Sequence, residues 1–95
     1  MVIGALVLQL QVPESESLKA KRQVVRSLAA RLRRTFNVAV AEVGDLDLWQ
    51  AARLGVVCVS TDSRHADEMC QKVLSFVAGE TEAILTRSTF EILHL

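Results

Sequence analysis

The sequence is poor in aromatic residues, with three Phe, one Trp and no Tyr among 95 residues. Sheets that bind RNA on an open face stack the bases on aromatic side chains, so this composition argues against a sheet of that kind. Glycine is also scarce, at four residues, and no glycine-rich loop is present that would surround a phosphate. No serine stands in the glycine-flanked turn that exposes a nucleophile. We therefore expect that the protein is not an enzyme.

Cysteine and histidine are too few and too scattered for a metal site. Cys58 and Cys70 lack the CxxC spacing of a metal-binding or redox loop, and His65 and His94 are isolated. The missing CxxC loop also excludes a metallochaperone. We expect no metal and no cofactor, and we interpret both cysteines as buried, reduced core residues.

Long apolar runs and an excess of charge are both absent. Hydrophobic residues make up 51% of the chain, but no run is long enough to cross a membrane. Met1 leads directly into a strand pattern, without the basic start and cleavage site of a signal peptide. We therefore expect residues 1–95 to form a single cytoplasmic domain. Eleven basic residues balance eleven acidic ones, which argues against a dedicated DNA-binding protein.

The charges are unevenly distributed along the chain. Residues 17–36, SLKAKRQVVRSLAARLRRTF, have helical periodicity and contain seven of the eleven basic residues, whereas nine acids follow from Glu42 onward. Ser17 is the expected N-cap of this helix. We expect the Lys21 ammonium to extend from the core to solvent, and Arg31 to point to solvent. The side of the helix expected to face the core consists of Leu18, Val25, Leu28, Leu32 and Phe36.

Four of the basic residues share one strip of this helix, which we call the basic rail: Lys19, Arg22, Arg26 and Arg33. On a wheel advancing about 100° per residue they lie within about 60° of one another. Several cations on one rigid element match the spaced phosphates of a nucleic acid. The alternative is an ordinary solvated helix face, because Lys and Arg are good helix formers.

The remaining chain alternates between strand and helix patterns. Pro13 ends the first strand, and residues 44–47 form a turn between the second and third strands. Asp62, or Thr61 before it, is the expected cap of the second helix, and Gly79 is expected to end that helix in a left-handed conformation. The last strand requires an irregularity that keeps its apolar residues in phase. The expected strands are 2–12, 38–43, 50–60 and 82–95, and the expected helices are 17–36 and 62–78.

This order predicts an α+β protein, a ferredoxin-like βαββαβ sandwich with a four-stranded antiparallel sheet and both helices on one face. We expect the first and third strands to be central and parallel. The opposite sheet face would then carry Ile3, Ala5 and Val7 in an apolar patch that a monomer rarely exposes. A homodimer through this face, or through the edge of the last strand, would cover it.

The turn before the third strand is a second candidate site. Trp49 is suited to stack on a base, and Asp45 and Asp47 are suited to contact a cation. The alternative is that Trp49 covers the core or a dimer contact and that Asp47 caps a helical turn. We expect Glu42 to form an ion pair with Arg53 across the hairpin.

Three segments resemble the YlxP-like family of small bacterial proteins of unassigned function. They are SLKAKR at 17–22, RRTFNVAVAEVGDLDLWQ at 33–50 and LGVVCVS at 54–60. The resemblance covers nearly the whole chain and implies a ferredoxin-like sandwich. Genes of this family often lie among those for translation initiation and ribosome maturation factors, which implies a role near RNA. The resemblance implies no particular catalytic or binding residues.

The sequence thus leads to a ranked set of functions. The first is a homodimeric accessory protein that contacts RNA or the ribosome through the basic rail, with Trp49 as an additional contact. The alternatives are a dimeric module that senses a small molecule and an adaptor that binds another protein through its acidic part.

Overall fold

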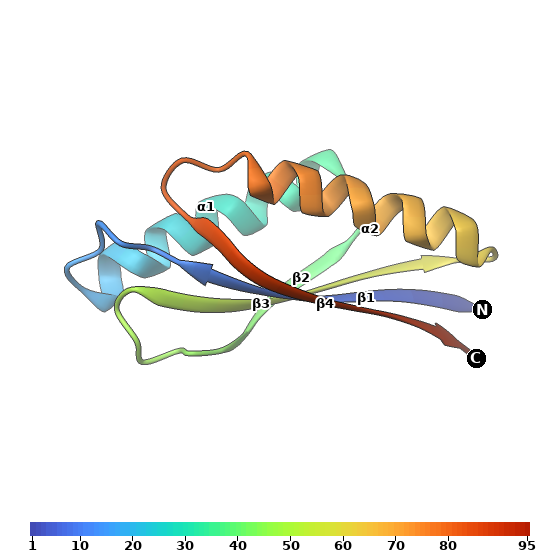
Figure 1. The fold of residues 1–95 in the computed structure, drawn as a ribbon, viewed down its shortest axis with the longest axis horizontal. Helices are drawn as coiled ribbons and strands as arrows, with labels where there is room; N and C mark the ends of the chain where they lie inside the picture. The colour runs from blue at the N-terminus through green and yellow to red at the C-terminus, as the bar shows by residue number, and fades with distance from the viewer.

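The computed structural model describes all 95 residues and has the predicted order of elements (Figure 1). The fold is a ferredoxin-like α+β sandwich, as expected from the alternation of strand and helix patterns. Neither helix has an apolar stretch long enough to cross a lipid bilayer. The elements are β1 (Val2–Gln11), α1 (Leu18–Thr35), β2 (Ala39–Gly44), β3 (Ala51–Ser60), α2 (Ser63–Ala78) and β4 (Ile84–His94).

The four strands form one sheet in the order β2-β3-β1-β4, and every neighbouring pair is antiparallel. The prediction that β1 and β3 are central is confirmed, but the prediction that they are parallel is wrong. The α1 crossover makes β1 and β2 parallel, and the β2–β3 hairpin then reverses the chain. β3 therefore runs opposite to β1.

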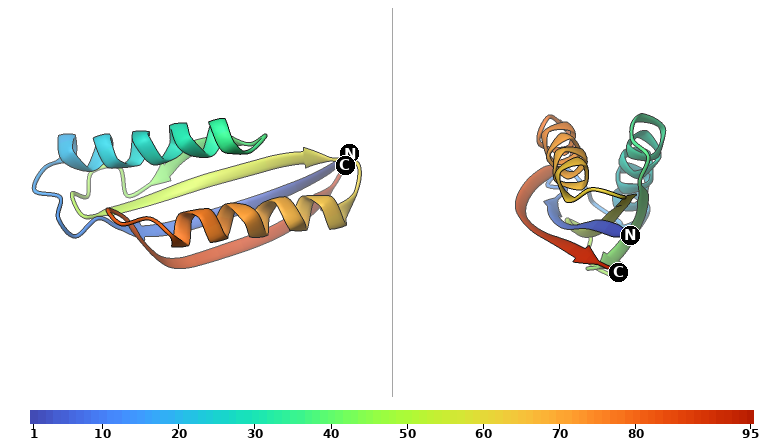
Figure 2. Two further views of the ribbon diagram at one scale, coloured as in Figure 1. Left: turned by 90° about the horizontal axis from the view of Figure 1, so that it is seen from above. Right: turned by 90° about the vertical axis from the view of Figure 1, so that its right-hand side faces the viewer.

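Both helices cover the same face of the sheet (Figure 2). Alternate residues of β1 point toward them, because successive side chains of a strand face opposite sides. Phe36 and Phe76 connect the ends of the two helices through an edge-to-face contact with ring centroids 5.7 Å apart. The core consists of residues such as Leu6, Leu8 and Leu10 of β1, Val25, Leu28 and Leu32 of α1, Leu54 and Val56 of β3, and Val73 and Val77 of α2.

Both helices begin at the predicted N-cap residues, whereas α2 does not end in the predicted conformation. The Ser17 side chain accepts a hydrogen bond from the Ala20 amide at 3.0 Å, and Asp62 accepts one from the Arg64 amide at 2.9 Å. Both predicted N-caps are thereby confirmed. Gly79 ends α2 with φ −84°, so the predicted left-handed conformation is wrong.

The irregularity predicted in the last strand is a β-bulge. The pairing of β1 with β4 shifts between Gln9, which faces Arg87, and Leu10, which faces Leu85. Thr86 is the extra residue, and its hydroxyl donates to the Gln9 carbonyl at 3.1 Å. Because side chains alternate along a strand, the bulge lets Leu85 pack against the core while Arg87 lies on the other face.

Gly4 packs where β1, β3 and α2 meet. A Cβ at this position would lie 2.9 Å from Cys70 Sγ and 3.0 Å from Cys58 Sγ. Both cysteines are free and buried, as predicted. Burial, together with the neighbouring Cys58 thiol and the charge of Asp67, raises the pKa of Cys70 to about 12.

The substitution Gly4→Ala is expected to lower the free energy of unfolding by about 1–3 kcal/mol, because the new methyl group overlaps both sulfur atoms. Urea denaturation measures this, with Gly79→Ala as the matched control, since a Cβ there has only ordinary contacts. Adding Cys70→Ala to Gly4→Ala should recover part of the loss. A Gly4→Ala protein as stable as the wild type would contradict the close packing.

Stability should fall as the pH rises above about 9, because the Cys70 thiol of the unfolded chain ionises near its ordinary pKa of 9.0 while the folded thiol keeps its proton. Between pH 8 and pH 10 this thiol should cost the wild type about 1.4 kcal/mol of unfolding free energy. Cys70→Ala removes this cost. The free energy of unfolding of the wild type minus that of Cys70→Ala should therefore be about 1.4 kcal/mol lower at pH 10 than at pH 8. The same difference at both pH values would contradict the raised pKa of Cys70.

Candidate nucleic-acid interface

The basic rail lies on the exposed side of α1 in a continuous helix. Lys19, Arg22, Arg26 and Arg33 are all exposed, and none of them forms an ion pair. The ion pairs of the molecule are formed by Lys21, Arg31 and Arg64 with Glu42, Glu80 and Glu68. The structure therefore leaves the positive charge of the rail without an acidic partner within the chain.

Three rail residues line a groove between α1 and β2. Arg22, Arg26 and Arg33 line it from the helix, and Ala41 and Glu42 line it from the strand. Its volume is about 210 Å³, and its apolar lining comes from Val25, Ala29, Ala41 and Leu54. The groove is thus lined by three arginines and by the single carboxylate of Glu42.

Arg33 is held in place at one end of this groove. Its guanidinium donates a hydrogen bond to the Val40 carbonyl at 2.6 Å, which ties the last turn of α1 to β2. A guanidinium has five N–H donors, so this one contact leaves the others available to a phosphate. Arg33 is therefore a pre-positioned cation.

Arg31 does not belong to this surface and is not solvated as expected. It forms a two-pronged ion pair with Glu80, in which Arg31 Nη2 donates to Glu80 Oε2 at 2.9 Å. This hydrogen bonding raises the pKa of the Arg31 guanidinium. The expectation that Arg31 points into solvent is wrong, because the segment after α2 brings Glu80 alongside α1.

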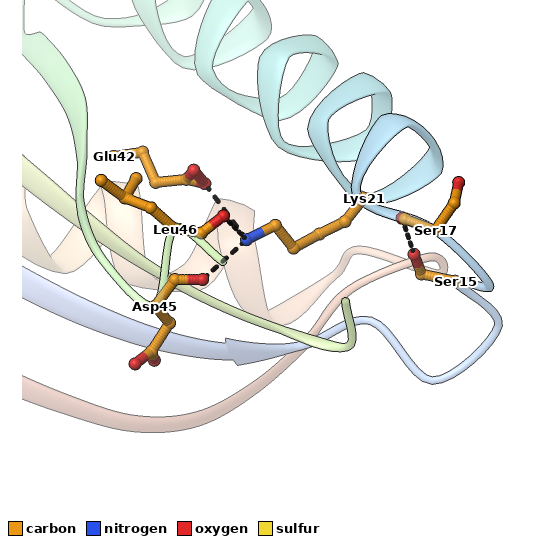
Figure 3. A network of polar contacts seen from close by, with 6 residues as sticks. All are labelled: Ser15, Ser17, Lys21, Glu42, Asp45 and Leu46. Carbon is orange, nitrogen blue, oxygen red and sulfur yellow. Dashed lines mark hydrogen bonds and ion pairs between the residues drawn. The ribbon is translucent and has the colours of Figure 1, made fainter. Parts of the chain in front are cut away.

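Lys21 is fully buried, although it belongs to the same basic helix (Figure 3). Its ammonium donates to the carbonyls of Asp45 at 2.8 Å and Leu46 at 3.3 Å, and it lies 3.8 Å from Glu42 Oε2. The expectation that this ammonium reaches solvent is wrong, because the turn after β2 closes over it. The buried lysine therefore attaches α1 to that turn.

The predicted ion pair between Glu42 and Arg53 is also wrong. The side chain of Glu42 turns toward Lys21, and Arg53 Nε is buried without an acceptor. Glu42 and Arg53 lie on opposite faces of the sheet, since Glu42 pairs with Leu54 and a register shift follows. The sequence contains no signal for this shift other than the Gly44 that follows it.

The β2–β3 turn is held by several contacts. Asp45 has φ 60°, and its carbonyl accepts a hydrogen bond from the Leu48 amide at 3.1 Å. The Gln50 side chain donates to the carbonyls of Ser15 at 3.1 Å and Pro13 at 3.3 Å. Asp47 caps no helical turn, so that alternative is wrong. The turn keeps a defined shape because both of its ends are tied to the segment around α1.

Trp49 is 56% exposed, so the interpretation that it covers the core is wrong, whereas its place at a dimer contact stays a prediction. It lines a hollow of about 600 Å³ together with Leu48 and with Gln11, Pro13, Gln50 and Ala51. None of these residues lines the arginine groove. The structure thus brings three rail residues together and places Trp49 at a separate surface. No group of three or more His, Cys, Asp or Glu side chains is arranged to hold a metal ion.

The fold and the exposed rail define the class of protein as a small ferredoxin-like sandwich with one cationic helix. The chain belongs to the family described as protein of unknown function (DUF503), which matches residues 3–90. It is 32% identical over 89 residues to the uncharacterized protein YlxP of Bacillus subtilis (strain 168), covering 92% of this chain and 97% of that protein. The family resemblance noted in the sequence is confirmed.

Replacing Lys21 with Met should lower the free energy of unfolding by about 2–4 kcal/mol, because two carbonyls and a carboxylate lose their buried partner. Urea denaturation measures the loss. Lys19→Met, an exposed change on the same helix, should stay within about 0.5 kcal/mol of the wild type. Adding Glu42→Gln should recover part of the loss, and equal stability of Lys21→Met and wild type would refute the role of the ammonium.

Proposed function

We propose that the protein is a non-enzymatic cytoplasmic accessory protein that binds RNA, or RNA within the ribosome, through the basic rail. The observation that carries this proposal is that Lys19, Arg22, Arg26 and Arg33 are exposed on one rigid helix without any acidic partner. Phosphates spaced along a backbone are recognised by several such cations. The groove beside Arg22, Arg26 and Arg33 offers a place for the backbone to lie.

The charge distribution favours α1 as the side of the protein that an RNA approaches. All eleven acids lie outside α1, so a polyanion is attracted to the rail more than to the remaining surface. The implied position of the family's genes near those for translation factors favours RNA over DNA.

The open sheet face is a poor alternative platform for RNA. Its strands carry aliphatic side chains on that side, and the only aromatic residue in the sheet, Phe90, pairs with the core residue Leu6. Stacking of bases requires aromatic or guanidinium planes. Trp49 offers one exposed aromatic ring, but it lies at a separate surface from the rail, so the proposal does not depend on it.

The test is the binding of fluorescent single-stranded RNA and of purified ribosomal particles at two salt concentrations. With four phosphate contacts, affinity for single strands should fall on the order of 50-fold over a fourfold rise in salt. Replacing all four rail residues with Gln should abolish most of this binding and bring the salt dependence close to zero.

The chain offers a matched control for this experiment. Replacing four other exposed bases with Gln removes the same charge and should leave most of the affinity intact: Arg34, Arg64, Lys72 and Arg87. Equal affinity of the two quadruple variants would contradict a specific role of the rail. A ligand-dependent rise in melting temperature without salt-sensitive RNA binding would instead indicate a small-molecule sensor.

A further inference from the structure

The sheet face opposite the helices is uncovered (Figure 2) and is apolar where β1, β2 and β3 lie side by side. Val43 is 54% exposed there, Val57 40% and Val59 64%. A contiguous group of exposed aliphatic side chains is unusual on a monomer and marks an interaction surface. We define the open-face patch as Ala5, Val7, Ala41, Val43, Val57 and Val59.

This face contains a shallow hollow, and the exposed side chain of Val59 lies on the same face. The hollow has a volume of about 440 Å³, and nine of the ten residues around it are hydrophobic. Gly55 forms part of its lining, and a Cβ there would lie 3.0 Å from Val43 Cγ1. Small side chains therefore create the hollow, while Val59 projects from the same strand. A surface that carries both features is suited to pack against a copy of itself.

The charges around the patch also favour a second copy. Arg53 and Arg87 flank Gln9 on the open face, and Glu91 lies opposite Ala5. Both signs thus occur on one border, so two copies can pair an arginine of one with Glu91 of the other. The buried Nε of Arg53 has no acceptor within its own chain. A nucleic acid fits this face poorly, because the patch itself contains no cation.

The available area is sufficient for a reversible dimer. A central strand of ten residues is about 33 Å long and four strands are about 15 Å across, so the face offers roughly 500 Å² per copy. Two copies would bury roughly 1,000 Å², which is the size of a weak, reversible interface and less than that of most stable ones. An association of this size is expected to depend on concentration in the micromolar range.

We infer that the open-face patch binds a second copy of this chain, sheet against sheet. The helices lie on the other face of each sheet, so both basic rails remain on the outside of the dimer. The inference depends on the apolar face alone and stands whether or not the rail binds RNA.

Sedimentation equilibrium over about 1–300 μM protein tests the inference, and the wild type should shift from monomer to dimer within this range. Val59→Glu and Val43→Glu each place a charge in the patch at a position that is more than half exposed, so the fold should persist. Each variant should remain monomeric throughout. Thermal unfolding provides a second measurement, because the melting temperature should rise with concentration for the wild type only.

Ser75→Glu is the matched control, since Ser75 is exposed on α2, which covers the other face of the sheet. This variant should dimerise as the wild type does. A wild type that is monomeric up to 300 μM would overturn the inference. Dimerisation of Val59→Glu and Val43→Glu with wild-type affinity would also overturn it, because the contact would then lie elsewhere, such as the edge of β4.

Discussion

The buried ammonium of Lys21 is the interaction on which the position of α1 against β2, and so the proposed RNA-binding groove, depends. Removing a charge from water costs several kcal/mol unless the charge is paired and hydrogen-bonded. Here two carbonyls of the β2–β3 turn and the nearby Glu42 carboxylate offset that cost. Because the lysine belongs to α1 and its acceptors follow β2, the contact sets how closely helix and strand approach. The arginine groove lies between these same two elements.

A second consequence is that the cations of one helix have different roles. Lys21 faces the interior, Arg31 joins α1 to Glu80, and the rail residues remain without acidic partners. The basic residues of α1 that form ion pairs are thus those whose side chains reach other elements of the fold. The rail residues form no ion pair because Glu42 is the only acidic residue of β2, and its carboxylate turns toward Lys21. This separation leaves one face of the helix for a polyanion.

The two faces of the molecule are physically distinct. The helix face carries charge on a rigid element, which suits contacts with phosphates in water. The open sheet face carries aliphatic side chains, which gain most from being removed from water. Binding on one face does not compete with binding on the other, so the proposed dimer would present two rails at once. Two linked rails would strengthen binding to a long RNA through effective concentration.

The sequence alone determined the order of elements, both N-caps, the alternation of β1 and the set of exposed rail residues. These features follow from spacing and local chemistry within one element, which periodicity records directly. The tertiary structure alone decided the partners of Lys21, Glu42 and Arg31, the antiparallel arrangement of β1 and β3, and the exposure of Trp49. Lys21 and Arg31 meet partners 24 and 49 positions away, and no periodicity specifies a contact between distant segments. Such contacts are selected by how the sheet and helices pack as a whole.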